Sequence, residues 1–197
     1  MTAAEQRKQQ KREVILAAAF TVFLEKGFAA STMQAIASRA GVTKGTVYLY
    51  FSDKNMLFQE AIRSKASPVF AGMNQQLKAT SGNVKQQLHQ AFTAFQESIT
   101  SANMPDVLRL LISEGLAFPQ LIEFYFEEFV QPTLAQYQHI LLRAAKQGEL
   151  HNPGICQYPQ LVMAPFIMNM LWHNLFKQVD SYTTKDMITV HLDTLFV

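Results

Sequence analysis

Residues 41–51 read GVTKGTVYLYF, and this stretch decides the fold because it joins a glycine turn to a short amphipathic helix. Gly41 can adopt a positive φ where two helices meet. Thr43 offers a hydroxyl at the expected start of the next helix. Val47 and Phe51 lie one helical turn apart and are expected to point inward. With a helix expected just before Gly41, the stretch predicts a helix-turn-helix.

Further helices are predicted on both sides of this stretch by apolar residues that recur every three or four positions. The first covers about residues 6–26 and ends at Gly27. The second covers about 33–40, with Ser31 or Thr32 as its cap, and the third covers about 44–50. A fourth opens at residues 52–54, with Ser52 or Asp53 as its cap. Pro68 is expected to kink or end it, because proline lacks a backbone donor.

The rest of the chain shows the same period and no alternating strand pattern. Helices are expected from Val84 to Ile99, from Pro105 to about Gly115, over 119–147 as one helix kinked at Pro132 or as two, over 155–177, and over 184–196. The predicted fold class is all-α, with about nine or ten helices. It comprises an N-terminal three-helix helix-turn-helix domain and a C-terminal helical bundle regulatory domain.

Charge is unevenly distributed along the 197 residues. Residues 1–65 hold ten Lys and Arg against five Asp and Glu, whereas the remainder holds seven against ten. The basic front indicates an anionic partner for that part alone, or else an unevenly charged solvated surface.

Several other classes of protein are disfavoured. The single cysteine, Cys156, allows no disulfide within the chain and indicates a reducing compartment. No segment reaches the ~18–20 apolar residues that cross a bilayer. The chain has no GxGxxG, P-loop, GxSxG or CxxC motif and no closely spaced histidine pair, so we expect neither an enzyme nor a metal site or cofactor.

The third helix has the chemistry of a nucleic-acid contact. Lys44 and two hydroxyls lie at its N-terminus, and Gly45 lets the backbone approach another surface closely. The alternative is a plain helical hairpin inside a bundle.

Residues 13–62 resemble the DNA-binding domain of the TetR/AcrR family of bacterial transcription regulators. The matching pieces are FLEKGF, ST, IASRAGVTKGTVYLYF, DK and LF, in the order and at the spacing of the family. They span four helices and about a quarter of the chain, whereas the remainder shows only a general likeness to the family's regulatory domain.

The resemblance implies roles for individual residues. It places Lys44 at a base edge, Gly45 and Thr46 where backbone and hydroxyl meet DNA, and Tyr48 and Tyr50 against base methyls and phosphate. It also implies phosphate contacts from Thr32, Thr43 and Lys54. Gln34 lies where some members of the family contact a base. Two positions depart from the family, namely Ala35, where many members carry an acid, and Leu49, where many carry a larger or polar residue.

The C-terminal half is expected to form a dimer, because sequence-specific binding usually needs two recognition helices ~34–36 Å apart. The segment LVMAPFIMNMLWHNLF is apolar nearly all round, which indicates burial on more than one side. The family forms a four-helix bundle from its last two helices, and the expected interface is Met163, Ile167, Leu171, Leu175, Ile188, Leu192 and Leu195. The alternative is a central core helix of a monomer.

An effector pocket is also expected in this half, and ordinary core is the alternative for each aromatic residue. The candidate lining residues are Phe92, Phe95, Glu114, Phe118, Tyr125, Phe166, Asn169, Met170 and His173. For Glu114, a carboxylate in an apolar helix, a protein partner or water is favoured over a cationic ligand.

The resulting hypothesis is a cytoplasmic bacterial regulator, associated with the nucleoid when bound. Residues 1–53 would form the DNA-binding domain, and residues 54–197 the ligand-binding and dimerisation domain, with the helix near 54 shared. It would be a homodimeric repressor that a small apolar or amphipathic effector releases from a palindromic operator in double-stranded DNA. The alternative is a DNA-binding regulator controlled by a protein partner, without a small effector.

Overall fold

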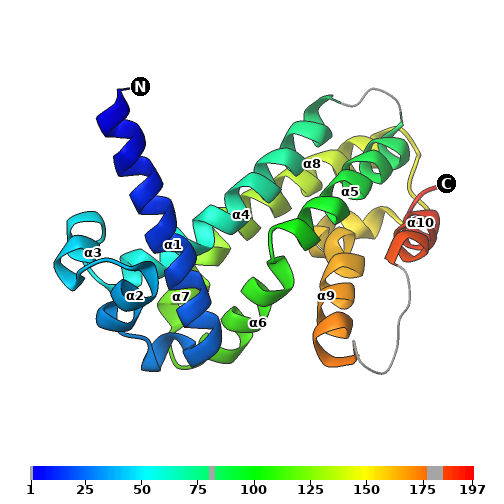
Figure 1. Cartoon of the computed structure of the whole chain (residues 1–197). Helices are drawn as coiled ribbons and strands as arrows, with labels where there is room; N and C mark the ends of the chain where they lie inside the picture. The colour runs from blue at the N-terminus through cyan, green and yellow to red at the C-terminus, as the bar shows by residue number, and fades with distance from the viewer. Residues whose placement is uncertain (1, 80–82, 177–183) are drawn as a thin grey trace. The chain divides into compact units, whose positions relative to one another are not determined.

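The computed structural model describes residues 2–79, 83–176 and 184–197. In chain order its elements are α1 (Ala3–Ala30), α2 (Met33–Ala40), α3 (Lys44–Tyr50), α4 (Lys54–Ala79), α5 (Val84–Ser101), α6 (Met104–Glu114), α7 (Pro119–Tyr125), the π-helix η1 (Phe126–Val130), α8 (Gln131–Lys146), the 3-10 helices η2 (Pro153–Gln157) and η3 (Pro159–Met163), α9 (Ala164–Phe176) and α10 (Thr184–Leu195). The all-α fold class is confirmed (Figure 1). Among the described residues, none of these helices is long and apolar enough to cross a membrane.

The chain divides into two compact units. The N-terminal unit comprises Met1–Lys65 and Asp106–Phe124, and the C-terminal unit comprises Ala66–Pro105 and Tyr125–Val197. The sequence prediction placed one boundary between residues 53 and 54, whereas here most of α6 and most of α7 join the first 65 residues. Helix α4 begins in one unit and ends in the other.

An aromatic cluster fills the centre of the N-terminal unit. Phe23, Phe28 and Phe58 are all buried, and their ring centroids lie 5.2–5.9 Å apart. Phe118, which follows α6, packs edge-on against Phe28 at 4.8 Å. These separations are typical of favourable aromatic pairs. The cluster therefore joins α1 and α4 to a segment much later in the chain.

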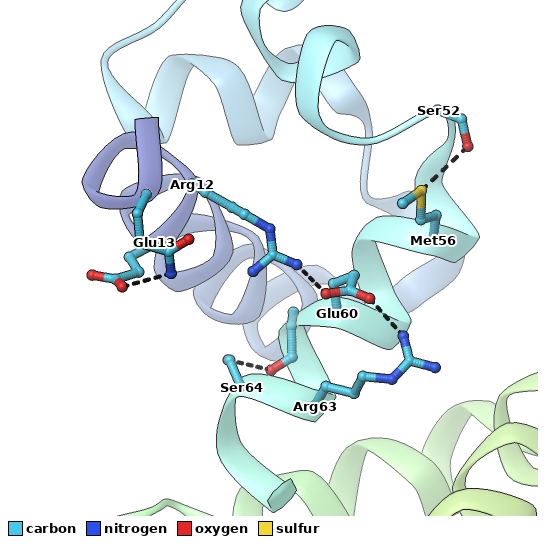
Figure 2. Close-up of polar contacts among 9 residues, drawn as sticks. Arg12, Glu13, Ser52, Met56, Glu60, Arg63 and Ser64 are labelled. Carbon is cyan, nitrogen blue, oxygen red and sulfur yellow. Dashed lines mark hydrogen bonds and ion pairs between the residues drawn. The ribbon is translucent and has the colours of Figure 1, made fainter. Parts of the chain in front are cut away.

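An ion pair joins α1 to α4 in the same unit, and a second pair within α4 shares its carboxylate (Figure 2). The Arg12 guanidinium reaches from α1 to the Glu60 carboxylate on α4 and also lies over the Phe51 ring, 5.5 Å from its centroid. Arg63, one turn further along α4, binds the other Glu60 oxygen at 2.6 Å. Glu60 is largely buried, so both pairs are less screened by solvent than an exposed pair.

The C-terminal unit has an aromatic core of its own. In α8, Tyr137 is fully buried; its hydroxyl donates to the Met73 sulfur at 3.0 Å and its ring packs on Phe92. Phe92 and Phe95 of α5 pack edge-on against Phe166 of α9 at 4.8 and 5.1 Å. Figure 1 shows α5 and α8 side by side, as these contacts require.

Prolines explain where the helices depart from the sequence prediction. Helix α4 continues through Pro68, so the prediction that it could end there was wrong. Around Pro132 the chain stays helical, but the π-helical turn η1 comes just before it. Pro132 therefore lies in the first turn of α8, where its missing N–H breaks no hydrogen bond within that helix. The helix expected from residue 155 begins only at Ala164, because Pro153 and Pro159 start short 3-10 helices instead.

Asp53 is the N-cap of α4, and it is one of the two caps predicted for this helix, the other being Ser52. Its Oδ1 accepts from the Met56 N–H at 2.8 Å, and its Oδ2 accepts from the Ser52 hydroxyl at 2.8 Å. These two hydrogen bonds, the first above all, lower the pKa of the Asp53 carboxyl below its ordinary value of 3.8.

We expect Asp53→Ala to reduce the free energy of unfolding by about 1 kcal/mol at neutral pH, the usual worth of an N-cap. Because the pKa of Asp53 is lower in the folded protein, the charge-dependent part of this stabilisation is complete above pH about 4 and is lost as the pH falls further. Chemical denaturation between pH 7 and 3 measures both effects. Asp53→Asn is the control, since asparagine caps the helix without a titrating group; a pH dependence equal to wild type in this variant would contradict the assignment.

Candidate DNA-binding interface

The turn between α2 and α3 has the geometry that the sequence predicts. Gly41 adopts φ 66° and ψ 32°, a left-handed conformation that glycine takes at little cost. Its N–H donates to Ser38 O at 3.3 Å, and the next N–H, of Val42, donates to Ala37 O at 3.0 Å. Helix α2 packs against α1, and α3 packs against α2, so the three form a helix-turn-helix unit (Figure 1).

One face of α3 is anchored in this unit. Val47 and Phe51 are buried, as their spacing predicts. A helix of seven residues is too short to be stable alone, so these anchors hold it in place.

The opposite face of α3 is open to solvent. Lys44, Gly45 and Tyr48 are exposed, and the Lys44 ammonium lies over the Tyr48 ring, 5.8 Å from its centroid. Leu49 lies on the same open face and is 83% exposed. Its departure from the family pattern was noted in the sequence, but it was not among the predicted contacts.

Threonines cap both helices of the motif. The Thr32 hydroxyl accepts from the Ala35 N–H, and the Thr43 hydroxyl accepts from the Thr46 N–H, each at 3.1 Å. Thr43 and Thr46 also share a hydrogen bond of 2.9 Å between their hydroxyls. The predicted caps are therefore confirmed, whereas phosphate contacts from these residues stay predictions.

Gln34 and Tyr50, two further residues predicted to contact DNA, differ in their exposure to solvent. Gln34 is exposed on α2, where its amide nitrogen lies 3.4 Å from the Ser38 hydroxyl. Tyr50 is half-buried, with its ring 6.3 Å from that of Phe51.

Lys54 has a structural role that sequence reasoning missed. Its ammonium donates to the carbonyls of Phe28, Ala29 and Ser31 at 2.7, 3.1 and 3.0 Å. An ammonium has three N–H donors, so these bonds use all of them. This arrangement disfavours the expected phosphate contact, which would need at least one donor to leave a main-chain carbonyl.

Two residues expected in the effector pocket belong to the N-terminal unit instead. The Glu114 carboxylate accepts from the main-chain N–H groups of Phe28 and Ala29. Phe118 packs on the Phe28 ring. Glu114 has thus found the protein partner favoured by the sequence, whereas the pocket role expected for it and for Phe118 stays a prediction.

The remaining pocket candidates lie in the C-terminal unit. Phe92, Phe95, Phe166 and Met170 are buried, Asn169 is half-buried, and burial raises the pKa of Tyr125 well above its ordinary range. The side chain of His173 lies outside the described residues. Two surface hollows of this unit, of about 390 and 520 Å³, are lined by other residues, such as Tyr158 and Leu161 in one and His139 and Arg143 in the other.

The candidates for a dimer interface divide by exposure. Ile167 is exposed and Leu175 is 70% exposed, whereas Met163, Leu171 and Leu195 are half-buried. Ile188 and Leu192 are buried within their own chain. Little of either side chain is left to bury against a partner, so their place in an interface stays a prediction that the burial within the chain does not favour. Met168, Phe176 and Val190 are exposed apolar residues of the same helices that the prediction omitted.

Among the side chains that the structure describes, no group of three or more His, Cys, Asp or Glu residues could hold a metal ion.

Comparison with known proteins agrees with this geometry. Residues 15–61 match the profile described as "Bacterial regulatory proteins, tetR family", and residues 79–187 match "Tetracyclin repressor-like, C-terminal domain". The second match alone covers more than half of the chain.

Curated relatives and solved structures extend the similarity to most of the chain. YdeS of Bacillus subtilis (strain 168), an uncharacterized HTH-type transcriptional regulator, is 30% identical over 169 residues, which cover 84% of this chain and 80% of YdeS. The HTH-type transcriptional repressor BepR of Brucella suis biovar 1 (strain 1330) is 32% identical over 146 residues, covering 72% of this chain and 69% of BepR. A transcriptional regulator from Rhodococcus sp. Rha1 shares the fold at 17% identity, with a TM-score of 0.71, over 93% of this chain and 95% of that one. The chain therefore belongs to the tetR family of bacterial regulatory proteins and is a DNA-binding transcriptional regulator.

Proposed function

We propose that this protein is a homodimeric repressor that binds a palindromic operator through α3 and leaves it when a small, mostly apolar effector binds the C-terminal unit. The observation that carries the proposal is the two-sided α3, buried through Val47 and Phe51 and open through Lys44 and Tyr48. Such a protein would act in the bacterial cytoplasm. Repression is supported by the description of BepR as a transcriptional repressor.

The open face of α3 carries suitable groups for both parts of DNA recognition. Lys44 can donate to the base-edge acceptors of guanine, and the apolar Leu49 can contact a thymine methyl in the major groove. The hydroxyls of Thr43 and Thr46 and the backbone at Gly45 can contact phosphate. We therefore assign operator reading to Lys44, Tyr48 and Leu49, and backbone contacts to the residues at the helix starts.

The dimer is supported by exposed apolar side chains on the last two helices. Ile167, Met168, Leu175 and Phe176 on α9 and Val190 on α10 are at least 40% exposed. A monomer would leave these side chains in water, and a two-fold partner offers the same apolar residues in return.

Effector binding is supported by the aromatic interior of the C-terminal unit and by an unpaired polar atom. The Oδ1 of Asn74, next to Met73 on α4, is buried and has no hydrogen-bond partner among the described residues. Because a buried acceptor without a donor is costly, a bound molecule with a hydroxyl or amine would stabilise this region.

Selection from a random duplex library tests the DNA-binding part of the proposal. We expect a palindromic site whose affinity falls steeply with salt. Lys44→Ala should relax the preference at one position of each half-site and weaken binding by about 1–3 kcal/mol. Lys146→Ala, which removes one exposed charge from the C-terminal unit, is the control and should bind as wild type. Equal retention of all sequences by the folded protein would sink the proposed operator recognition.

Sedimentation tests the dimer. Leu175→Glu should convert the wild-type dimer into a species of 22.3 kDa, because it places a charge in the centre of the proposed interface. Leu142→Glu is the control, since Leu142 is also exposed but lies on α8. A Leu175→Glu variant that still sediments as a dimer would place the interface elsewhere.

Release of a labelled operator tests the effector. We expect some members of a panel of fatty acids, aromatic compounds and amphipathic amines to lower operator affinity, and Asn74→Leu to shift the concentration needed. If no compound releases the DNA, while a protein from the source cells does, the alternative of control by a protein partner is favoured.

A further inference from the structure

Helix α1 is interrupted at Gly27, and two distant side chains bind the main chain just after it. Gly27 has φ 73° and ψ 171°, far from helical values. The N–H groups that follow find an acceptor in a distant side chain, because Glu114 Oε2 lies 2.8 Å from the Phe28 nitrogen and 3.3 Å from the Ala29 nitrogen. Glu114 is 86 residues away in the sequence, at the end of α6.

The main-chain carbonyl oxygens of the same stretch accept hydrogen bonds from a positively charged side chain. The Lys54 ammonium holds the oxygens of Phe28, Ala29 and Ser31 and also lies 4.5 Å from the Phe28 ring centroid. Residues 28–31 are thus held between a carboxylate on their donors and an ammonium on their acceptors. Hydrogen bonds to charged groups are about twice as strong as neutral ones.

Glycine is required at residue 27 because a φ of 73° is strained for any other residue. A Cβ there would also lie 2.5 Å from Glu114 Oε1, so the carboxylate would have to move away. In the residue after Glu114, a Cβ at Gly115 would lie 2.5 Å from the Ile122 Cδ1 on α7 and 2.6 Å from the Leu111 carbonyl oxygen. The Glu114 carboxylate therefore lies directly against the main chain at Gly27, and this position depends on the absence of a side chain there.

The stretch leads directly into the DNA-reading helices. Ser31 donates to the Gly27 carbonyl at 2.6 Å, and the next residue, Thr32, is the N-cap of α2. Because α2 is joined to α3 through the short Gly41 turn, the direction in which the chain leaves residue 31 sets where α3 begins.

We propose that Glu114 is a positioning residue for DNA binding, which orients α2 and α3 by holding the main chain at Phe28 and Ala29. Glu114 itself touches no DNA. This inference rests on the proposed function, and it adds that a residue from the second half of the sequence sets the geometry of the reading helices.

Three substitutions at Glu114 separate positioning from general stability. In Glu114→Gln the amide oxygen can still accept both N–H groups, so operator affinity should stay within about threefold of wild type. Glu114→Asp keeps the charge but is one methylene too short, and Glu114→Ala removes the acceptor. Both should weaken operator binding by about tenfold, within the usual range of coupling between sites, at a temperature where each variant is folded.

Glu149→Ala is a matched control. Glu149 also accepts a main-chain N–H with its carboxylate, from Val84 at 2.8 Å, but it does so in the C-terminal unit. We expect Glu149→Ala to lower the melting temperature about as much as Glu114→Ala while leaving operator affinity unchanged. Sedimentation of each variant shows whether the dimer is retained.

Two readouts distinguish positioning from a purely structural role. The slope of affinity against salt should be unchanged in Glu114→Ala, because no phosphate contact is removed. In a double-mutant cycle with Lys44→Ala, the two losses should be less than additive, since a misplaced α3 gains little from Lys44.

Hydrogen exchange measures the contact itself. The amides of Phe28 and Ala29 should exchange faster in Glu114→Ala and Glu114→Asp, but at about the wild-type rate in Glu114→Gln. Unchanged exchange at these amides, or wild-type operator affinity in a destabilised Glu114→Ala, would overturn the inference.

Failure of the proposed function gives a different result. If the wild-type protein prefers no duplex, operator recognition is wrong, and the exchange of α2 and α3 amides decides the positioning role alone. Faster exchange throughout these helices in Glu114→Ala, relative to Glu149→Ala, would then support it, and unchanged exchange would overturn it.

Discussion

The helix-turn-helix of this regulator depends on how the main chain of residues 28–31 is hydrogen-bonded. A helix interrupted inside a compact unit leaves N–H and C=O groups without their usual partners, and each buried one costs about 1–3 kcal/mol if it stays unpaired. Lys54 supplies donors and Glu114 supplies the acceptor, from two different helices. The Phe28 side chain points into the aromatic cluster while its backbone is held by these charges, so packing and polar bonding fix the same residue.

The burial pattern of α3 shows how a short helix can be both rigid and available. Val47 and Phe51 are buried in the core, whereas Lys44, Tyr48 and Leu49 are exposed to solvent. Caps at Thr43 and the Gly41 turn fix both the start of α3 and its angle to α2. If α3 binds DNA as proposed, the helix itself needs no rearrangement beforehand, which would lower the entropy lost on binding.

The sequence allowed accurate prediction wherever the cause was local. The Gly41 turn, the threonine caps and the inward direction of Val47 each follow from neighbours within four residues. The effect of each proline was harder to predict. Pro68 lies inside a helix, whereas Pro159 begins a 3-10 helix, and which of these outcomes a proline gives depends on the surrounding packing.

Roles that depend on distant partners were missed. The spacing of Ile188 and Leu192 predicts that both are buried, but it does not show whether their own chain or a second copy covers them. The family resemblance implied a phosphate contact for Lys54, and its carbonyl partners, 23 to 26 residues earlier in the sequence, gave no local signal of its structural role. Glu114 carried a signal, as an acid in an apolar helix, but nothing near it in the sequence pointed to Phe28.

The N-terminal unit is assembled from two separate stretches of chain, and this affects how the protein is made. During synthesis, residues 1–65 leave the ribosome before the end of α6 exists, so the Phe28 and Ala29 amides have no acceptor and the Phe28 ring lacks Phe118. The intervening residues 66–105 must be translated first, at about 5–20 residues per second. The nascent chain thus passes several seconds with an incomplete N-terminal unit, and a chain that ends within that interval lacks the Glu114 and Phe118 contacts to Phe28.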